Sequence, residues 1–312
     1  MPVQAACCIL SFDRSIRMKT VCVFTPTYNR AYILPTLYES LVSQTSQDFM
    51  WLIVDDGSTD GTCSLVSSWK QEGKVDITYV KKENGGKPRA INTGVALCEC
   101  PLFFCVDSDD HLVPGAVARI VDDYEAIRDD NRIAGIVALR GTDEHTPMVT
   151  WIPDGLTEVK YWDLFEKYHF AGDTSLIHKT EVLRKYPYDV APGEKFIAET
   201  SVYYRLDDHY LMRTDNTILT ICHYLPDGLT KNFAKNAREN PIGYRKHKLY
   251  CAQRSQTLAG KFRETTLYLV GCRMTGEKGG LSKAPNKVIG ALCELPASVA
   301  YHTIFGGKKA NG

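Results

Sequence analysis

An apolar run at residues 102–106 ends in three carboxylates, those of Asp107, Asp109 and Asp110, with Ser108 between the first two. A buried strand that carries clustered negative charge at its carboxyl end suits a divalent cation. Hard cations such as Mg²⁺ and Mn²⁺ take oxygen ligands and often share them with substrate phosphates. A strand leading into a solvated acidic turn is the alternative interpretation, and the motifs that follow favour the cation.

A basic segment with two glycines lies at residues 84–92, ahead of a predicted helix. Gly85 and Gly86 permit close approach of the backbone, and Lys87 and Arg89 supply positive charge near the helix N-terminus, which favours a phosphate. The spacing matches neither a P-loop nor a dinucleotide-binding fingerprint, so a kinase or a dehydrogenase is disfavoured. A flexible basic turn is the alternative.

Two further polar segments follow apolar runs. In residues 25–30, Pro26 fixes a bend, and the hydroxyls of Thr25 and Thr27 with the amide of Asn29 can surround a planar base. In residues 55–60, the carboxylate of Asp56 can accept a hydrogen bond from a uracil imide. A polar turn and a helix N-cap are the corresponding structural alternatives.

The elements that must position these residues alternate along the first part of the chain. Apolar runs predict strands at residues 21–25, 51–54, 77–80, 102–106 and 133–139, and helical spacing predicts helices at 34–44, 59–69, 90–97 and 116–127. This alternation predicts an α/β fold with a mostly parallel central sheet flanked by helices. Such sheets bind ligands at the carboxyl ends of their strands, where the polar segments lie.

The pattern is looser after residue 140. It predicts strands at residues 148–152, 174–178 and 217–224 and helices at 162–167 and 199–211, followed by helices at 241–258, 261–274 and 287–305. From Lys231 onward the chain has 15 Lys or Arg and 4 Asp or Glu. This basic, amphipathic region can pack as a helical cap, which we favour, or lie on an anionic membrane surface.

Composition narrows the class of protein. The net charge of the 312 residues is zero, so no nucleic-acid partner is expected, and the absence of an 18-residue apolar run predicts no transmembrane helix. Eleven scattered cysteines, several in apolar runs, indicate reduced thiols and a cytoplasmic protein. Residues 1–18 are expected to be a disordered extension. Alternatively, Met18 is the natural start and residues 1–17 precede it.

Taken together, these motifs resemble the family 2 glycosyltransferases of the GT-A fold, the nucleotide-diphospho-sugar transferase fold. The resemblance runs from about residue 19 to residue 115. It rests on the order and spacing of six pieces, at residues 25–30, 40–44, 54–60, 84–87, 92–94 and 107–110.

The resemblance implies roles for particular residues. Those expected to bind the nucleotide-sugar donor are Thr25, Pro26, Thr27, Asn29, Asp56, Lys87, Asp107 and Ser108. Asp107 and Asp109 are expected to hold Mn²⁺ or Mg²⁺, which makes Asp109 catalytic.

The second half of the chain resembles the family less closely. Aligning Arg205 with the family arginine places Glu199 at the position of the catalytic base, but Ala198 precedes it where the family usually has an acidic residue. Rival carboxylates are Asp173, Glu194, Asp207 and Asp208. Residues 224–232 resemble a segment that can cover the donor, and His223 is the histidine most expected to contact ligand.

The implied protein is a metal-dependent, inverting hexosyltransferase of bacterial polysaccharide synthesis. It would move a sugar, with a UDP-sugar as the expected donor, to a glycan or lipid-linked oligosaccharide at the inner face of the plasma membrane. Residues 19–115 would form the donor half, 116–230 the acceptor half and 231–312 a basic helical region. The alternatives are a sugar-nucleotide-binding protein without transferase activity and a nucleotidyltransferase.

Overall fold

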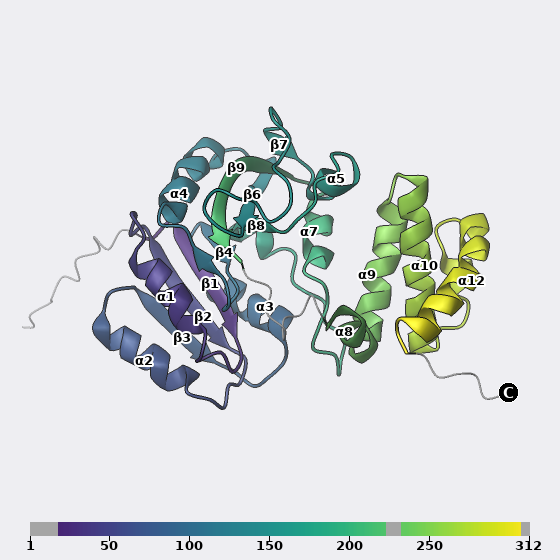
Figure 1. Cartoon of the computed structure of the whole chain (residues 1–312), viewed down its shortest axis with the longest axis horizontal. Helices are drawn as coiled ribbons and strands as arrows, with labels where there is room; N and C mark the ends of the chain where they lie inside the picture. The colour runs from purple at the N-terminus through teal and green to yellow at the C-terminus, as the bar shows by residue number, and fades with distance from the viewer. Residues whose placement is uncertain (1–17, 223–231, 307–312) are drawn as a thin grey trace, which may run out of the picture.

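The structure is a computed structural model that describes residues 18–222 and 232–306, and a single sheet forms its centre (Figure 1). The sheet order is β3-β2-β1-β4-β8-β6-β9-β5, with β7 paired to β9. The strands are β1 (Val21–Thr27), β2 (Phe49–Asp55), β3 (Ile77–Lys81), β4 (Leu102–Cys105), β5 (His111–Leu112), β6 (Ile133–Gly141), β7 (Glu158–Val159), β8 (Thr174–Lys179) and β9 (Leu211–Ile221).

The two halves of the sheet differ in strand direction. β3, β2, β1 and β4 are parallel, as the alternation of strands and helices predicts. β8 enters antiparallel between β4 and β6, while β6 and β9 are again parallel to each other. The α/β class is therefore confirmed, and the strictly parallel part of the sheet ends at β4.

Helices cover both faces of the sheet. They are α1 (Leu34–Val42), α2 (Thr62–Glu72), α3 (Lys87–Leu97), α4 (Ala116–Ile127), α5 (Tyr161–Glu166), α6 (Thr180–Leu183) and α7 (Thr200–Leu206). Because side chains alternate along a strand, Val21 and Val23 of β1 share a core with α1, α2 and α4, whereas Cys22 and Phe24 share one with α3. All nine described cysteines are free thiols, and most are buried.

The chain ends in a bundle with its own hydrophobic core, at the far end of the molecule from α1 and α2 (Figure 1). Its helices are α8 (Phe233–Glu239), α9 (Pro241–Arg254), α10 (Leu258–Thr275), α11 (Gly280–Lys283) and α12 (Lys287–Thr303). α9 connects this bundle to the sheet domain. Glu194 accepts hydrogen bonds from the amides of Ile242 and Gly243 at 2.6 and 2.8 Å, and Arg254 pairs with Asp208 at 2.5 Å.

Three predicted elements differ from the structure. Residues 148–152 form no strand, because their backbone bonds to scattered partners: Thr150 to Ala171, and Ile152 to the side-chain amide of Asn216. The helix predicted at 199–211 ends at Leu206, and β9 occupies 211–221 instead of 217–224. The polar residues in the middle of β9 interrupt the apolar pattern from which a strand would be predicted. Residues 1–17, His223 and most of the segment 224–232 lie outside the described residues.

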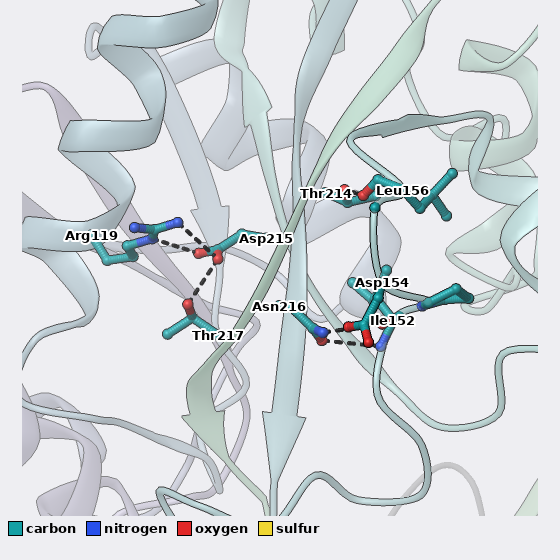
Figure 2. A pocket seen from close by; sticks show the side chains of 10 residues that line it. Arg119, Ile152, Asp154, Leu156, Thr214, Asp215, Asn216 and Thr217 are labelled. Atoms are coloured by element: carbon teal, nitrogen blue, oxygen red, sulfur yellow. Dashed lines mark hydrogen bonds and ion pairs between the residues drawn. The ribbon is translucent and has the colours of Figure 1, made fainter.

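Beside β9 lies a small pocket of about 300 Å³, shown in Figure 2. There, Arg119 of α4 donates two hydrogen bonds to Asp215 of β9, at 2.9 and 3.0 Å, and Thr217 donates another at 2.7 Å. Buried Asp123 lies 3.2 Å from Arg119 and 3.6 Å from Arg213. These charged side chains therefore hold α4 against β9 of the sheet.

We expect Asp123→Asn to weaken the pH dependence of stability. Burial and the neighbouring Asp215 raise the pKa of Asp123 to about 6, although Arg119 and Arg213 oppose the shift. The folded protein then keeps a proton that the unfolded chain loses above about pH 4, so stability falls as pH rises from about 4 to about 6. Urea unfolding midpoints at several pH values test this. Exposed Asp122→Asn is the control, and an unchanged pH profile in Asp123→Asn would contradict the assignment.

Candidate active site

A cleft of about 750 Å³ lies at the carboxyl ends of β1, β2 and β4. Its lining joins residues from both halves of the sheet domain. From the N-terminal half, the lining includes Pro26, Thr27, Asp56, Lys87, Asp107, Ser108 and Asp109, and the second half contributes Asp173, Glu199 and Tyr203. The structure thus brings together most of the predicted site residues.

The acidic turn after β4 presents its carboxylates to the cleft. The amide of Val106 continues the pairing with β1 by donating to the carbonyl of Phe24 at 2.9 Å, and the amide of Asp110 closes a turn on the carbonyl of Asp107 at 3.1 Å. Asp107 and Asp109 remain partly exposed on the cleft lining. Burial and the charge of Asp107 raise the pKa of Asp109. Negative charge is thereby concentrated where the parallel strands end.

Lys87 joins the two sides of the cleft. Its ammonium lies 2.5 Å from Oδ1 of Asp107 and 2.6 Å from Oε1 of Glu199. Burial would lower the pKa of Lys87, but the two carboxylates raise it well above its usual value, so the side chain is a fixed cation. The pKa of Asp107 is lowered in turn, because Lys87 and Arg140 outweigh the effect of burial. A positive charge is therefore already held against the acidic turn.

Asp56 organises the loop that carries Lys87. Its carboxylate accepts hydrogen bonds from the amides of Gly85 and Gly86 at 2.9 and 2.6 Å and from Lys82 at 2.7 Å. The loop is thus fixed against the end of β2 immediately before α3 begins. Asp56 also lines the cleft, as expected for a residue at the carboxyl end of a parallel strand.

Arg140 is a cleft residue that sequence reasoning missed. It extends from β6 and donates to the carbonyl of Thr174 at 3.0 Å and to Oδ2 of Asp110 at 3.1 Å. Burial raises the pKa of Asp110 to about 7, while Arg140 opposes that shift. The available signal was an arginine at the end of an otherwise apolar run, residues 133–139. An arginine that is half-buried is stabilised by an acidic partner, and Asp110 supplies it.

Glu199 stands at the N-terminus of α7, where its side chain makes no capping hydrogen bond. Its carboxylate instead contacts Lys87 and accepts a hydrogen bond from Tyr203 at 2.9 Å, so it faces the cleft. Two rival carboxylates have structural partners: Glu194 caps α9, and Asp207 caps α5 through the amides of Tyr161 and Trp162. Asp208 pairs with Arg254.

Among the rival carboxylates, Asp173 does line the cleft. Arg205, aligned with the family arginine, is bound instead to the backbone carbonyls of Ser201 and Pro187.

Two predicted donor residues do not line the cleft. Thr25 is fully buried, and its hydroxyl accepts a hydrogen bond from the indole of Trp51 at 2.9 Å. Asn29, in the left-handed region with φ 53°, accepts a hydrogen bond from the amide of Thr59 through its side-chain oxygen, and its own backbone amide donates to the hydroxyl of Ser58. Both residues shape the segments that line the cleft. The exposed ring of Tyr28, which was not predicted, lies on the lining instead.

The sequence matches the family described as Glycosyl transferase family 2 over residues 22–186, more than half of the 312 residues. The chain belongs to this family. It is 32% identical over 108 residues to a chondroitin synthase of Escherichia coli, and 27% identical over 189 residues to the poly(ribitol-phosphate) beta-N-acetylglucosaminyltransferase TarP of Staphylococcus aureus strain N315. These matches cover 35% and 59% of this chain, but only 16% and 53% of the respective relatives.

Solved structures give the fold of this family 2 member. TarS residues 1–349 from S. aureus superpose with a TM-score of 0.55 at 16% identity, covering 93% of this chain and 90% of that one. The mannosyltransferase PcManGT from Pyrobaculum calidifontis, solved with GDP-Man and Mn²⁺, gives 0.53 at 15% identity, covering 93% of this chain and 83% of that one. The GT-A fold that the resemblance implied is confirmed.

Gly86→Ala should damage the site, whereas Gly85→Ala should not. Gly86 has φ +91°, and a Cβ there would lie 1.8 Å from the carbonyl oxygen of Lys195. At Gly85 the nearest atoms, at 3.1 Å, belong to the flexible side chains of Arg89 and Lys82. We expect Gly86→Ala to weaken donor binding and lower stability by about 1–3 kcal/mol. Calorimetric donor titration and thermal unfolding measure both, and equal behaviour of the two variants would refute the assigned role.

Proposed function

We propose that the chain transfers a sugar from a nucleoside-diphosphate donor to a hydroxyl group of an acceptor, with inversion at the anomeric carbon. The observation that carries this proposal is the cleft in which Lys87 bridges Asp107 of the donor half and Glu199 of the second half. The two carboxylates share Lys87 but differ in their other neighbours, since Asp107 belongs to the acidic turn and Glu199 accepts a hydrogen bond from Tyr203, and this difference suits separate roles in a transfer reaction.

The relatives support the donor and acceptor classes. TarP is a poly(ribitol-phosphate) beta-N-acetylglucosaminyltransferase, and TarS has been solved with UDP and with UDP-GlcNAc. We therefore favour a UDP-sugar as donor and a glycan or lipid-linked oligosaccharide of cell-surface polysaccharide synthesis as acceptor. The corresponding location is the cytoplasm, at the inner face of the plasma membrane.

Asp107 and Asp109 are the residues that would hold Mn²⁺ or Mg²⁺. The acidic turn fits a cation, since it already accepts the ammonium of Lys87 and both carboxylates reach the cleft. The described residues contain no cluster of three or more metal-ligating side chains, so the remaining ligands would be oxygens of the donor diphosphate and water. PcManGT was solved with Mn²⁺. When bound, the cation would neutralise charge on the leaving diphosphate.

The residues of the chain have complementary tasks in this reaction. The acceptor oxygen bonds to the anomeric carbon as the bond from that carbon to the diphosphate breaks, and the electron pair leaves with the nucleoside diphosphate. Lys87 places positive charge on the side of the cleft where the diphosphate binds. Glu199 accepts the proton of the attacking hydroxyl, and Tyr203 orients its carboxylate.

Asp109→Ala should nearly abolish transfer while the protein stays folded. Removing one preorganised electrostatic partner of a transition state costs about 10²–10³-fold in rate. The measurement is product formation from a panel of sugar nucleotides with Mn²⁺, with Mg²⁺ and with a chelator, beside thermal unfolding. Asp129→Ala, at an exposed aspartate just after α4, is the control.

The outcomes of this assay separate the candidate functions. Transfer that persists unchanged in both the chelator and Asp109→Ala would overturn the metal assignment. Tight donor binding without turnover by the wild type would favour a sugar-nucleotide-binding protein, and release of pyrophosphate from a nucleoside triphosphate would favour a nucleotidyltransferase.

Glu199→Gln should lower turnover by about 10²–10⁴-fold with little change in donor affinity. Glutamine preserves the shape of the side chain but cannot take the proton of the acceptor hydroxyl. Single-turnover rates and donor titrations distinguish the two effects. Glu181→Gln, at an exposed position of α6, is the matched control, and Asp173→Asn tests the rival carboxylate that lines the cleft. Near-normal turnover in Glu199→Gln together with loss in Asp173→Asn would move the base to Asp173.

A further inference from the structure

The outward face of α12 is apolar along its whole length. Val288, Leu292, Leu295 and Val299, which we call the α12 stripe, are 71%, 63%, 74% and 54% exposed. Their spacing of four, three and four residues places them on one side of the helix. Half of the sixteen large hydrophobic side chains that the described residues expose lie within residues 258–304. The exposure is therefore concentrated on the bundle.

This arrangement inverts that of an ordinary surface helix. The face of α12 that packs into the bundle carries small residues, among them the buried Gly290, Cys293 and Ala297. The large apolar side chains point outward, although the inner face of a globular protein normally takes them. Packing of the bundle does not explain the α12 stripe. An exposed apolar surface of this kind marks a site of interaction with another surface.

The start of α10, which contacts α12, also exposes large apolar side chains. Cys293 of α12 donates to the carbonyl of Phe262 at 3.4 Å, so these two helices are in contact there. Phe262 is 39% exposed, and Leu258, one turn earlier, is 74% exposed. Exposed apolar side chains therefore occur on two helices of the bundle that touch each other.

The charge balance of residues 258–306 indicates which kind of partner would bind the α12 stripe. The three acidic residues of 258–306 are all ion-paired within the bundle: Glu264 with Lys248, Glu277 with Arg245, and Glu294 with Arg273. Lys261, Lys278 and Lys287 have no ion-pair partner among the described residues, and the latter two are exposed. The unbalanced charge is positive, so two copies of the bundle would repel each other, whereas an anionic surface would attract either one.

We propose that the α12 stripe and these lysines form a docking surface for a membrane that contains anionic lipid. No helix among residues 18–222 and 232–306 is both long and apolar enough to cross a bilayer. α12 would therefore lie in the plane of the membrane, with its apolar side chains among the acyl chains and the lysines among the headgroups. This inference extends the proposed function. The link between the docking surface and a lipid-linked acceptor rests on that proposed function.

Vesicle sedimentation without donor or acceptor tests the surface independently of catalysis. The probes are vesicles of phosphatidylcholine alone and of phosphatidylcholine with 30% phosphatidylglycerol, a composition chosen for a strong anionic surface. The full chain should bind the anionic vesicles at least about tenfold more tightly than the neutral ones, and binding should weaken in high salt. Leu292→Glu with Leu295→Glu should reduce binding to the anionic vesicles by about tenfold or more.

The controls separate docking from folding. Val149→Glu introduces one charge at an equally exposed apolar site of the sheet domain and should bind vesicles like the wild type. Circular dichroism and donor binding should be unchanged in the double variant. Equal binding by the wild type and the double variant, or no binding of the wild type to anionic vesicles, would overturn the proposal. So would a wild-type dimer in analytical ultracentrifugation that the double variant abolishes while vesicles bind neither protein.

Discussion

The organisation of the cleft depends on the two ion pairs that the ammonium of Lys87 makes. It lies between Asp107, at the end of the parallel part of the sheet, and Glu199, at the start of α7. These residues are far apart in the chain and belong to different halves of the domain. A half-buried cation between two carboxylates is stable only where its partners are fixed. The loop geometry imposed by Asp56 and the backbone approach allowed by Gly86 provide that fixation.

Several charged side chains of the cleft are buried or half-buried, and most of them are paired with an opposite charge. Arg140 lies behind the acidic turn and pairs with Asp110, which burial would otherwise favour in its protonated form. Asp109 is the exception, because its pKa is raised by burial and by the adjacent Asp107. Arg30 and Lys87 oppose this shift only in part, and a cation bound there, as proposed, would favour the charged form of Asp109.

Sequence reasoning found the parts of the fold that local patterns determine. β1, β2 and β4 were visible as apolar runs, and the rule that ligands bind at carboxyl ends placed Asp56, Lys87 and Asp107 in one cleft. It failed where contacts distant in sequence decide. Thr25 turned inward because the indole of Trp51 needed an acceptor, and residues 148–152 paired with a side chain of β9. No local pattern reveals either partner.

The bundle is attached to the elements that complete the cleft, which gives the inferred membrane surface a mechanical connection to it. The side chain of His247 in α9 contacts the hydroxyl of Thr200 at 3.1 Å, one residue after Glu199. Glu194, five residues before Glu199, caps the same helix. Since α9 also packs against α10, which contacts α12, the orientation of a docked bundle would be transmitted through two helices to α7. A membrane-bound acceptor would then meet a cleft whose direction is fixed relative to the bilayer.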